Sequence, residues 1–238
     1  MFKEKVQVGS IDVDGSQELK LSSLFKIMQE VASHHVDKYK IGHKELLAHN
    51  MCWVVIRMNV QILKTPKLND YLTVTTHPGV VRGFVFPRFF QIYDEKGNLV
   101  VNVSSMWCII DKTTRRVVLK PSEFDVVKPE HNKDDMEMPE KVSGDSLSLV
   151  DTRKVRYSEI DLNGHLNNTE YIEFMLDTHK VDFYKQNRIA SILINYDKEI
   201  KAGEVVELYS NNNEPEVIRG TVDGVNRFTA SITYERKQ

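Results

Sequence analysis

The sequence follows one plan twice: a strand, a long apolar helix and then several alternating strands. The segment "VQVGSIDVDG" (6–15) matches "VRYSEIDLNG" (155–164) at an offset of 149. The identical pairs there are Val6/Val155, Ile11/Ile160, Asp12/Asp161 and Gly15/Gly164. Past this point the first copy has four extra residues, and matches such as Leu21/Leu166 and His34/His179 continue at an offset of 145. Because these short identities agree with the order of the predicted elements, we expect a duplicated unit.

Each copy contains one segment with helical periodicity. In the first, apolar residues recur at three- and four-residue steps from Leu21 to Val36, with Ser22–Ser23 as candidate caps. The second segment runs from about Asn168 to Tyr184 and is apolar nearly all round between Tyr171 and Leu176. A helix with this composition is expected to be covered on most sides.

Alternating strands follow each helix. Between residues 52 and 62 the even positions are apolar and the odd ones include Arg57, Asn59 and Gln61, which predicts a strand with one buried face. Further strands are expected at 71–77, 82–93, 99–110, 189–196, 204–210, 217–222 and 226–234. The segments "DEKGN" (94–98) and "DG" (223–224) predict hairpin loops. Each copy should therefore be a sheet wrapped around a helix, and two such units side by side can merge their sheets.

The middle of the chain separates the two copies. Residues 120–147 are rich in proline, charge and serine, which is typical of a linker. We therefore expect an N-terminal unit at 1–119, a linker at 120–147 and a C-terminal unit at 148–238. A chain of 238 residues is long enough for either one large domain or two small fused ones.

Composition excludes several classes of protein. The 32 basic and 34 acidic side chains give a formal net charge of −2, which argues against a protein held on nucleic acid by bulk charge. The apolar runs are too short to span a bilayer, and "MFKEKVQVGS" does not have the pattern of a signal peptide. Cys52 and Cys108 are too few for a disulfide framework or a thiolate zinc site. A soluble, cytoplasmic protein is the expectation.

The stretch "EIDLNGHLNN" (159–168) is the candidate for chemistry. An extended backbone would turn Asp161, Asn163 and His165 to one face. Alternatively, Asn163 begins a turn with the next glycine, and His165 and Asn167 satisfy helix-end amides. Asn167 is in any case a candidate helix cap, with Glu170 three residues on.

The first copy serves as an internal control for this stretch. At the offset of 149 it has Asp12, Asp14 and Ser16, so it lacks the imidazole and the amide. A turn alone does not need these groups. Asp161 and His165 could begin a metal site, but no further ligands with suitable spacing follow, and we predict no metal or cofactor.

At these residues the chain resembles the acyl-acyl carrier protein thioesterases. "DLNGHLNNTEYIEFML" is similar to the family's Asp-x-Asn-x-His-x-Asn-Asn-x-x-Tyr-Ile segment. "WVVIRMNVQILKTP" (53–66), "MWCIIDKTTRR" (106–116) and "INYDKEI" (194–200) resemble its strands, so the match covers most of the chain. The resemblance implies an α+β fold of two tandem hotdog units, each a long helix wrapped by an antiparallel sheet, merged as a double hotdog. It also implies hydrolysis of fatty acyl-acyl carrier protein, the step that ends fatty-acid synthesis.

The resemblance further implies a catalytic set of Asp161, Asn163, His165 and Glu199. Glu199 would be the general base on water, with Asp161 orienting its neighbours. Plant members often have a cysteine directly after the acid, but Ile200 stands there in this chain, so we expect no cysteine nucleophile. The N-terminal unit would then shape an acyl cavity, with the candidate lining residues Trp53, Met58 and Trp107.

The implied partner is acyl carrier protein, which is acidic and would be recognised by local basic groups. Candidates are Lys112, Arg115 and Arg116, or Arg153, Lys154 and Arg156, although each could equally be a solvated surface charge. Two other functions stay open: an acyl-CoA thioesterase, and a sensor that binds acyl thioesters without cleaving them. Whether the double unit forms a homodimer is also left open.

Overall fold

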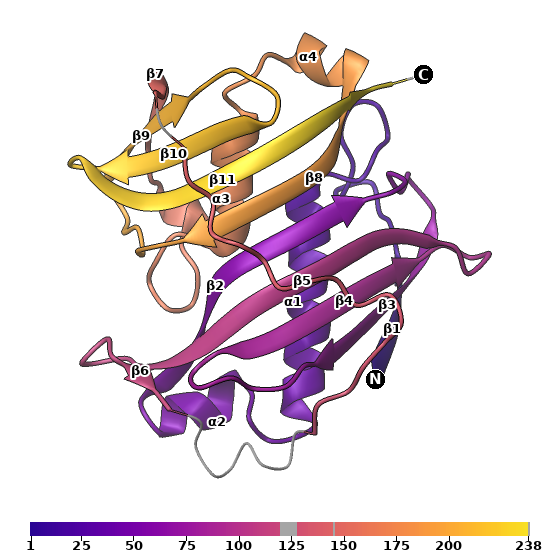
Figure 1. Ribbon diagram of the computed structural model, residues 1–238, viewed down its shortest axis with the longest axis vertical. Helices are drawn as coiled ribbons and strands as arrows, with labels where there is room; N and C mark the ends of the chain where they lie inside the picture. The colour runs from indigo at the N-terminus through magenta and orange to yellow at the C-terminus, as the bar shows by residue number, and fades with distance from the viewer. Residues whose placement is uncertain (120–127, 145, 238) are drawn as a thin grey trace.

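The computed structural model describes residues 1–119, 128–144 and 146–237 (Figure 1). The N-terminal half contains, in chain order, β1 (Phe2–Gln7), α1 (Leu21–Asp37), α2 (His43–Ala48), β2 (Met51–Ile62), β3 (Tyr71–Pro78), β4 (Phe86–Tyr93), β5 (Leu99–Asp111) and β6 (Val117–Val118). The C-terminal half contains β7 (Ser148–Lys154), α3 (Asn168–Leu176), α4 (Val181–Gln186), β8 (Asn187–Tyr196), β9 (Val205–Ser210), β10 (Glu216–Val222) and β11 (Val225–Arg236).

The strands of the described residues form one antiparallel sheet whose two halves mirror each other. The order is β1-β3-β4-β5-β2-β8-β11-β10-β9-β7, with β6 paired to β5. From the centre outward, the N-terminal half has the order β2, β5, β4, β3, β1. The C-terminal half has β8, β11, β10, β9, β7, which is the same order when the strands of each half are counted along the chain without β6. The halves meet where β2 pairs with β8, from Arg57 opposite Asn195 to Gln61 opposite Ser191. The predicted merging of two sheets is confirmed.

Helices cover one face of this sheet and an irregular segment crosses the other (Figure 1). The core lies between α1, α3 and the sheet, where Met28, Phe174 and Phe228 are almost wholly buried. On the opposite face, residues 128–144 run across both halves without a helix or strand. Ser104 Oγ donates to the Glu137 carbonyl at 2.7 Å, for example. Residues 120–127 and 145 of the predicted linker lie outside the described residues, and its boundaries stay a prediction.

Two details of the helix predictions are wrong. The N-cap of α1 is Lys20, and Ser22 and Ser23 lie buried inside the helix. The second helical segment is two helices, because hydroxyl groups take the carbonyls where α3 ends. Thr178 Oγ1 donates to the Met175 carbonyl at 2.6 Å, and the Tyr184 hydroxyl donates to the Leu176 carbonyl at 2.7 Å. Among the apolar residues of the segment 171–176, the expected burial is confirmed for all but Leu176, which is partly buried.

The strand β2 does not keep one buried face along its length. Its register against β5 shifts between Val55 and Arg57, which is the mark of a β-bulge. Beyond the bulge the even positions Met58, Val60 and Ile62 are buried in the core, as predicted. Before it the side chain that joins this core is Val55. The even positions 52, 54 and 56 instead pack with Cys108 in a separate small cluster.

Both predicted hairpin loops are present. The Asp94 N–H donates to the Asn98 carbonyl at 2.9 Å, which closes the loop between β4 and β5. Asp223 and Gly224 both have positive φ values, 51° and 70°, as a tight hairpin turn requires. The strand β4, however, starts at Phe86 rather than at 82, since Arg82 and Val85 pair with each other in a turn before it.

From this loop to the start of the helix, the two copies align at one offset of 147, not at 149 and 145. The Asp14 N–H donates to the Glu18 carbonyl at 2.9 Å, and the Asp161 N–H donates to the His165 carbonyl at 2.8 Å. The helix caps Lys20 and Asn167 are also 147 residues apart, so there is no insertion between these points. The counterparts of Asp161, Asn163 and His165 are therefore Asp14, Ser16 and Glu18, and our sequence alignment of this loop was wrong.

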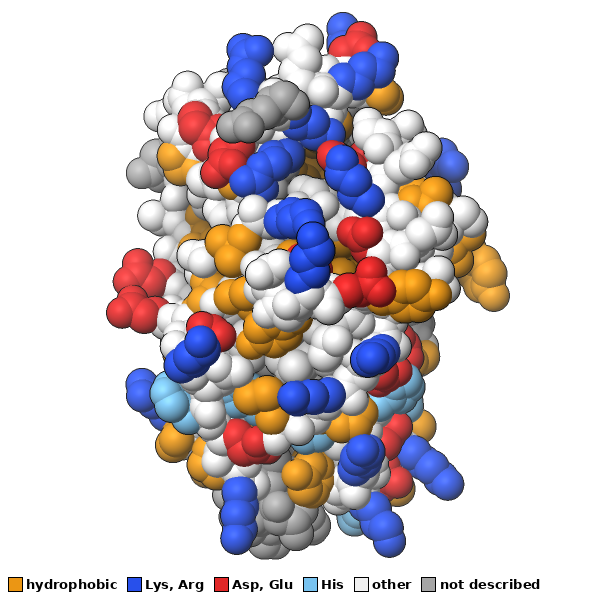
Figure 2. All heavy atoms as spheres, turned by 90° about the vertical axis from the view of Figure 1, so that its right-hand side faces the viewer, with side chains coloured by type: hydrophobic (Ala, Val, Ile, Leu, Met, Phe, Trp, Pro, Cys, Tyr) orange, Lys and Arg blue, Asp and Glu red, His pale blue; other side chains and the backbone are white. Residues whose placement is uncertain are grey.

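The nearly balanced charge of the chain is also mixed on its surface. Figure 2 shows a face on which Lys and Arg side chains are interspersed with Asp and Glu side chains. Among the described residues, no helix is long and apolar enough to cross a membrane.

Candidate active site

A closed turn, not an extended strand, carries Asp161, Asn163 and His165. Besides the Asp161–His165 backbone bond, the Gly164 N–H donates to the Asp161 carbonyl at 3.0 Å. Gly164 has a φ of 83°, a conformation that glycine adopts without strain. The expectation of one shared face is wrong because the Asp161 carboxylate folds the loop: its Oδ1 accepts the N–H groups of Asn163 at 2.8 Å and His165 at 3.2 Å. The turn that we considered as the alternative is the one present.

His165 and Glu199 meet beside this turn. The Leu166 N–H donates to the Ile200 carbonyl at 2.8 Å, which brings the loop alongside the chain just after β8. As a result, Nε2 of His165 lies 3.3 Å from Oε2 of Glu199. The side chain of His165 is 19% exposed and that of Glu199 is 34% exposed, so the pair is partly shielded but open to a substrate. The N-cap of α3 is Asn167, so neither His165 nor Glu199 caps this helix.

Asn167 caps α3, as predicted. Its Oδ1 accepts the Thr169 N–H at 3.1 Å. The Glu170 carboxylate, which we considered for a capping box, lies 3.7 Å from the Lys26 ammonium instead. Because the cap already occupies the Thr169 N–H, this donor at the start of α3 is not free for a substrate carbonyl.

The surroundings of His165 favour the neutral form of its imidazole. Burial lowers the pKa of its imidazole, and the nearby Arg115 guanidinium lowers it further, against an opposing effect of Asp161. Nδ1 of His165 and Oδ1 of Asn163 are both buried without a hydrogen-bond partner in the described structure. Buried polar atoms are normally paired, so these two atoms have hydrogen-bonding capacity that the loop itself does not use.

Arg115 is the residue of this site that the sequence analysis assigned elsewhere. Its guanidinium forms an ion pair with Oε1 of Glu199. We had considered Arg115 as a docking residue for the carrier protein. Motif spacing could not place it here, because 84 residues separate the two partners. The motif ending in Thr-Arg-Arg identified the segment that contains Arg115 but not Glu199 as its ion-pair partner.

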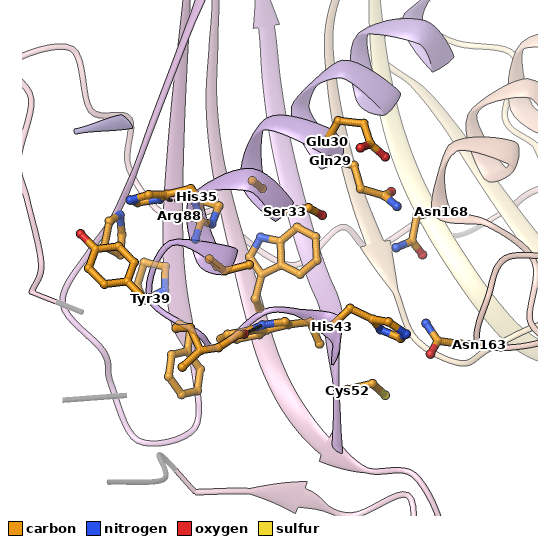
Figure 3. Close-up of a pocket in the computed structure, with 18 of the residues that line it drawn as sticks. Gln29, Glu30, Ser33, His35, Tyr39, His43, Cys52, Arg88, Asn163 and Asn168 are labelled. Carbon is orange, nitrogen blue, oxygen red and sulfur yellow. Dashed lines mark hydrogen bonds between the residues drawn. The ribbon is translucent and has the colours of Figure 1, made fainter. Parts of the chain in front are cut away.

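A cavity of about 350 Å³ begins at the same loop and lies mainly in the N-terminal half. Asn163 and Asn168 line one end, near His43 and Cys52, while His35 and Arg88 lie toward the other (Figure 3). Of the three residues expected to line it, Trp53 and Trp107 do so. Met58 is instead 94% buried in the core, at 6% exposure. His165 and Glu199 lie beside the cavity rather than in its lining. Asp161 and Asn163 line the cavity and also belong to the loop that carries His165.

Comparison with known protein families identifies the family of this chain. The profile of the acyl-ACP thioesterase N-terminal domain matches residues 1–126, and that of the C-terminal domain matches residues 144–233.

The chain belongs to the acyl-ACP thioesterase family.

Its relatives in this family are distant in sequence and close in fold. The chloroplastic oleoyl-acyl carrier protein thioesterase 2 of Arabidopsis thaliana is 23% identical over 100% of this chain and 70% of its own length. The chain spans about half, 54%, of a chloroplastic palmitoyl-acyl carrier protein thioesterase from the same plant, also at 23% identity. An acyl-ACP thioesterase structure from Bacteroides thetaiotaomicron has a TM-score of 0.89 at 24% identity, with 98% of this chain and 97% of that one covered.

These comparisons confirm the double-hotdog α+β fold and assign this acyl-ACP thioesterase family member to the thioester hydrolases. Its two cysteines are both free and buried. Burial raises the pKa of the Cys52 thiol, and that of Cys108 to about 11. A thiol with a raised pKa is a poor nucleophile at neutral pH. The described residues also contain no group of three or more His, Cys, Asp or Glu side chains that could hold a metal ion.

Proposed function

We propose that this chain hydrolyses the thioester of fatty acyl-acyl carrier protein and releases the free fatty acid, with Asp161, Asn163, His165 and Glu199 as the active site. One observation carries the proposal. The His165–Glu199 pair lies at the loop whose Asn163 opens into the cavity of the N-terminal half. A proton-transfer pair beside a cavity that can take an acyl chain is what thioester hydrolysis requires.

In the proposed mechanism, Glu199 removes a proton from a water molecule. The water oxygen then bonds to the thioester carbonyl carbon, and the carbonyl becomes an oxyanion. Collapse of this intermediate breaks the carbon–sulfur bond, and the proton returns to the sulfur through His165, 3.3 Å from Glu199. Proton transfer by positioned side chains of this kind contributes roughly 10²–10⁴-fold in rate.

Asn163 and Asp161 have different parts in this scheme. Asn163 lines the cavity, so its amide can hold the water or the thioester oxygen at the cavity end. Asp161 acts through the backbone, because its carboxylate accepts the N–H groups of Asn163 and His165. In our proposal Asn163 therefore touches the substrate, while Asp161 holds the loop.

The acyl chain would occupy the cavity of about 350 Å³, which places it in the N-terminal unit of residues 1–119. Residues 120–147 would link this unit to the catalytic unit of residues 148–238. The indole rings of Trp53 and Trp107 give the cavity apolar walls suited to an alkyl chain.

Acyl carrier protein is the proposed partner, and the cytoplasm the proposed location. Of the basic candidates, Arg153 is held by Glu159 and Asp177 and stacks on Phe174. Arg115 is held by Glu199. Three exposed candidates are left for an acidic partner on the surface near the loop: Arg116, Lys154 and Arg156. Rim charges of this kind act mainly on the rate of association.

The test is the initial rate of thiol release from acyl carrier protein and coenzyme A thioesters of the same acyl chain, with His165→Ala alongside. Preferential cleavage of the carrier-protein thioester, lost in the variant, is the expected result. Equal or faster cleavage of acyl-CoA would assign the chain to acyl-CoA hydrolysis instead. Tight binding of both thioesters without thiol release would make it an acyl-binding sensor.

A further inference from the structure

The Glu199 carboxylate is shared between the two halves of the chain. Its Oε1 pairs with the Arg115 guanidinium, and its Oε2 lies 3.3 Å from His165. Arg115 belongs to the turn between β5 and β6 in the N-terminal half, whereas Glu199 follows β8 in the C-terminal half. One oxygen therefore points to a fixed cation and the other to the imidazole.

The turn that presents Arg115 is itself well held. The Asp111 carboxylate accepts the N–H groups of Thr113 at 3.0 Å and Thr114 at 2.6 Å. The Arg115 N–H donates to the Asp111 carbonyl at 2.9 Å. Arg115 has a φ of 58°, where glycine or asparagine would be favoured. Arginine is uncommon in this conformation.

Among the described residues, the C-terminal half contacts Glu199 at its backbone carbonyl and, on the carboxylate, through His165. Arg227 Nη1 donates to the Glu199 carbonyl at 3.1 Å. This bond fixes where the residue lies but leaves the carboxylate free to rotate. The ion pair with Arg115 is the contact that orients the carboxylate, since a guanidinium holds an oxygen in a defined direction.

We propose that Arg115 is a positioning residue for hydrolysis: it holds Oε1 of Glu199 so that Oε2 stays directed at His165. The inference rests on the proposed function, because it assigns to Glu199 the role of base. It means that the catalytic pair of the C-terminal half is completed by a residue of the N-terminal half.

A purely structural role is the alternative, and the duplicated fold provides its control. On the other side of the molecule Lys237, which follows β11, pairs with Glu18. Glu18 is the counterpart of His165, so this ion pair also joins the two halves next to the equivalent loop. Among the described residues, no histidine forms an ion pair with Glu18. If these ion pairs only hold the two halves together, Arg115–Glu199 and Lys237–Glu18 should have the same role. Positioning of a catalytic group would be specific to Arg115.

Arg115 also affects the proton affinity of His165. The charged groups that act on the imidazole come from its own loop, from the segment before β9 and from the β5–β6 turn: Asp161, Glu199, Lys201, Glu204 and Arg115. Arg115 lowers the pKa of His165, so its removal should raise that pKa. The acid side of the pH–rate profile should then move to higher pH, because His165 becomes protonated sooner as pH falls.

The experiment compares Arg115→Gln, Arg115→Lys and Lys237→Gln with the unaltered chain, on acyl carrier protein thioesters, for kcat, KM, pH profile and thermal unfolding. We expect Arg115→Gln to lower kcat by about 10- to 100-fold with little change in KM, as misplacing a catalytic group does. Arg115→Lys should recover part of the loss. Lys237→Gln should keep kcat even where it lowers the unfolding temperature.

A second comparison tests whether Arg115 acts through Glu199. In a Glu199→Gln background, Arg115→Gln should cost little further activity, because the group that it positions is already lost. A rise in KM at unchanged kcat would make Arg115 a docking residue and overturn the inference, as would full activity of Arg115→Gln. If the unaltered chain cleaves no acyl thioester, the proposed function fails and this inference with it. If the unaltered chain is active but Arg115→Gln does not change kcat, this inference fails and the proposed function stands.

Discussion

His165 and Glu199 approach each other at 3.3 Å in the C-terminal half, and neither residue has an equivalent of its own kind in the other half. The Leu19 N–H donates to the Pro66 carbonyl just as the Leu166 N–H donates to the Ile200 carbonyl, both at 2.8 Å. This correspondence puts Glu18 in the place of His165 and Thr65 in the place of Glu199. The duplicated fold therefore offers a matched control for each catalytic candidate.

Replacing either member of the pair should remove turnover and leave the fold intact. We expect His165→Gln and Glu199→Gln each to lower kcat by roughly 10²–10⁴-fold, since each removes one proton-transfer group. Thiol release under saturating acyl carrier protein thioester measures this. Thr65 is the counterpart of Glu199, and Thr65→Ala should leave kcat unchanged. Near-normal turnover in either member's variant would contradict the proposed pair.

Asp161→Ala should damage both stability and turnover, whereas Asp14→Ala should damage stability alone. Asp161 accepts two backbone N–H groups, and Asp14 accepts the equivalent ones of Ser16 at 2.8 Å and Glu18 at 3.1 Å. The loss of these bonds should cost about 1–3 kcal/mol in each variant, measured by urea unfolding. Equal loss of kcat in both variants would show that the loop of the N-terminal half also takes part in hydrolysis.

Hydrolysis should persist below the pH at which an ordinary histidine is protonated. Burial and Arg115 lower the pKa of His165 from its usual 6.5. If neutral His165 is needed, the midpoint of the acid decline in kcat/KM should lie below pH 6.5. The profile is measured with one acyl carrier protein thioester over the range in which the chain stays folded. A midpoint above pH 6.5 would assign the acid limb to another group.

Stability should fall in mildly acidic solution because of His35. Burial, together with Arg88, lowers the pKa of this histidine from 6.5 to about 4. The unfolded chain binds a proton at the higher pKa, so the free energy of unfolding decreases as pH falls through that window. The full effect is about 3 kcal/mol at 1.36 kcal/mol per pKa unit. We expect His35→Gln to flatten the dependence of unfolding free energy on pH between these values.

The adjacent His34 is the control for this measurement. It is exposed, and its hydrogen bond to Glu4 raises the pKa of the imidazole. Its protonation therefore favours the folded chain, so His34→Gln should not flatten the acid decline. A flattening by His34→Gln equal to that by His35→Gln would contradict the assignment to the buried residue.

The strands and hairpins could be predicted from the sequence because their signals are local. Alternation along β11 and the turn at Asp223 and Gly224 need no information from the rest of the chain. The break after α3 could not be predicted, because it depends on where the Tyr184 hydroxyl folds back. The bulge in β2 was also hidden, since apolar residues stand on both of its faces near residues 52–56.

The site was accessible to sequence analysis only in part. The loop from Asp161 to His165 was recognised as unusual from its residues, but the choice of Glu199 came from family resemblance alone. Arg115 was assigned to a surface role, because a cation in a turn gives no sign of a partner in the other half. The alignment of the two copies went wrong by two residues, since short identities outweighed a hydrogen-bonding pattern that sequence does not display.

The pairing of β2 with β8 has a consequence for dilute solution. Two separate subunits joined by such a seam would come apart as their concentration fell. Here both strands belong to one chain, and residues 128–144 run along both halves, so the tether sets an effective concentration that dilution does not change. The proposed active site, which draws Arg115 from one half and Glu199 from the other, can thus stay assembled however few molecules are present.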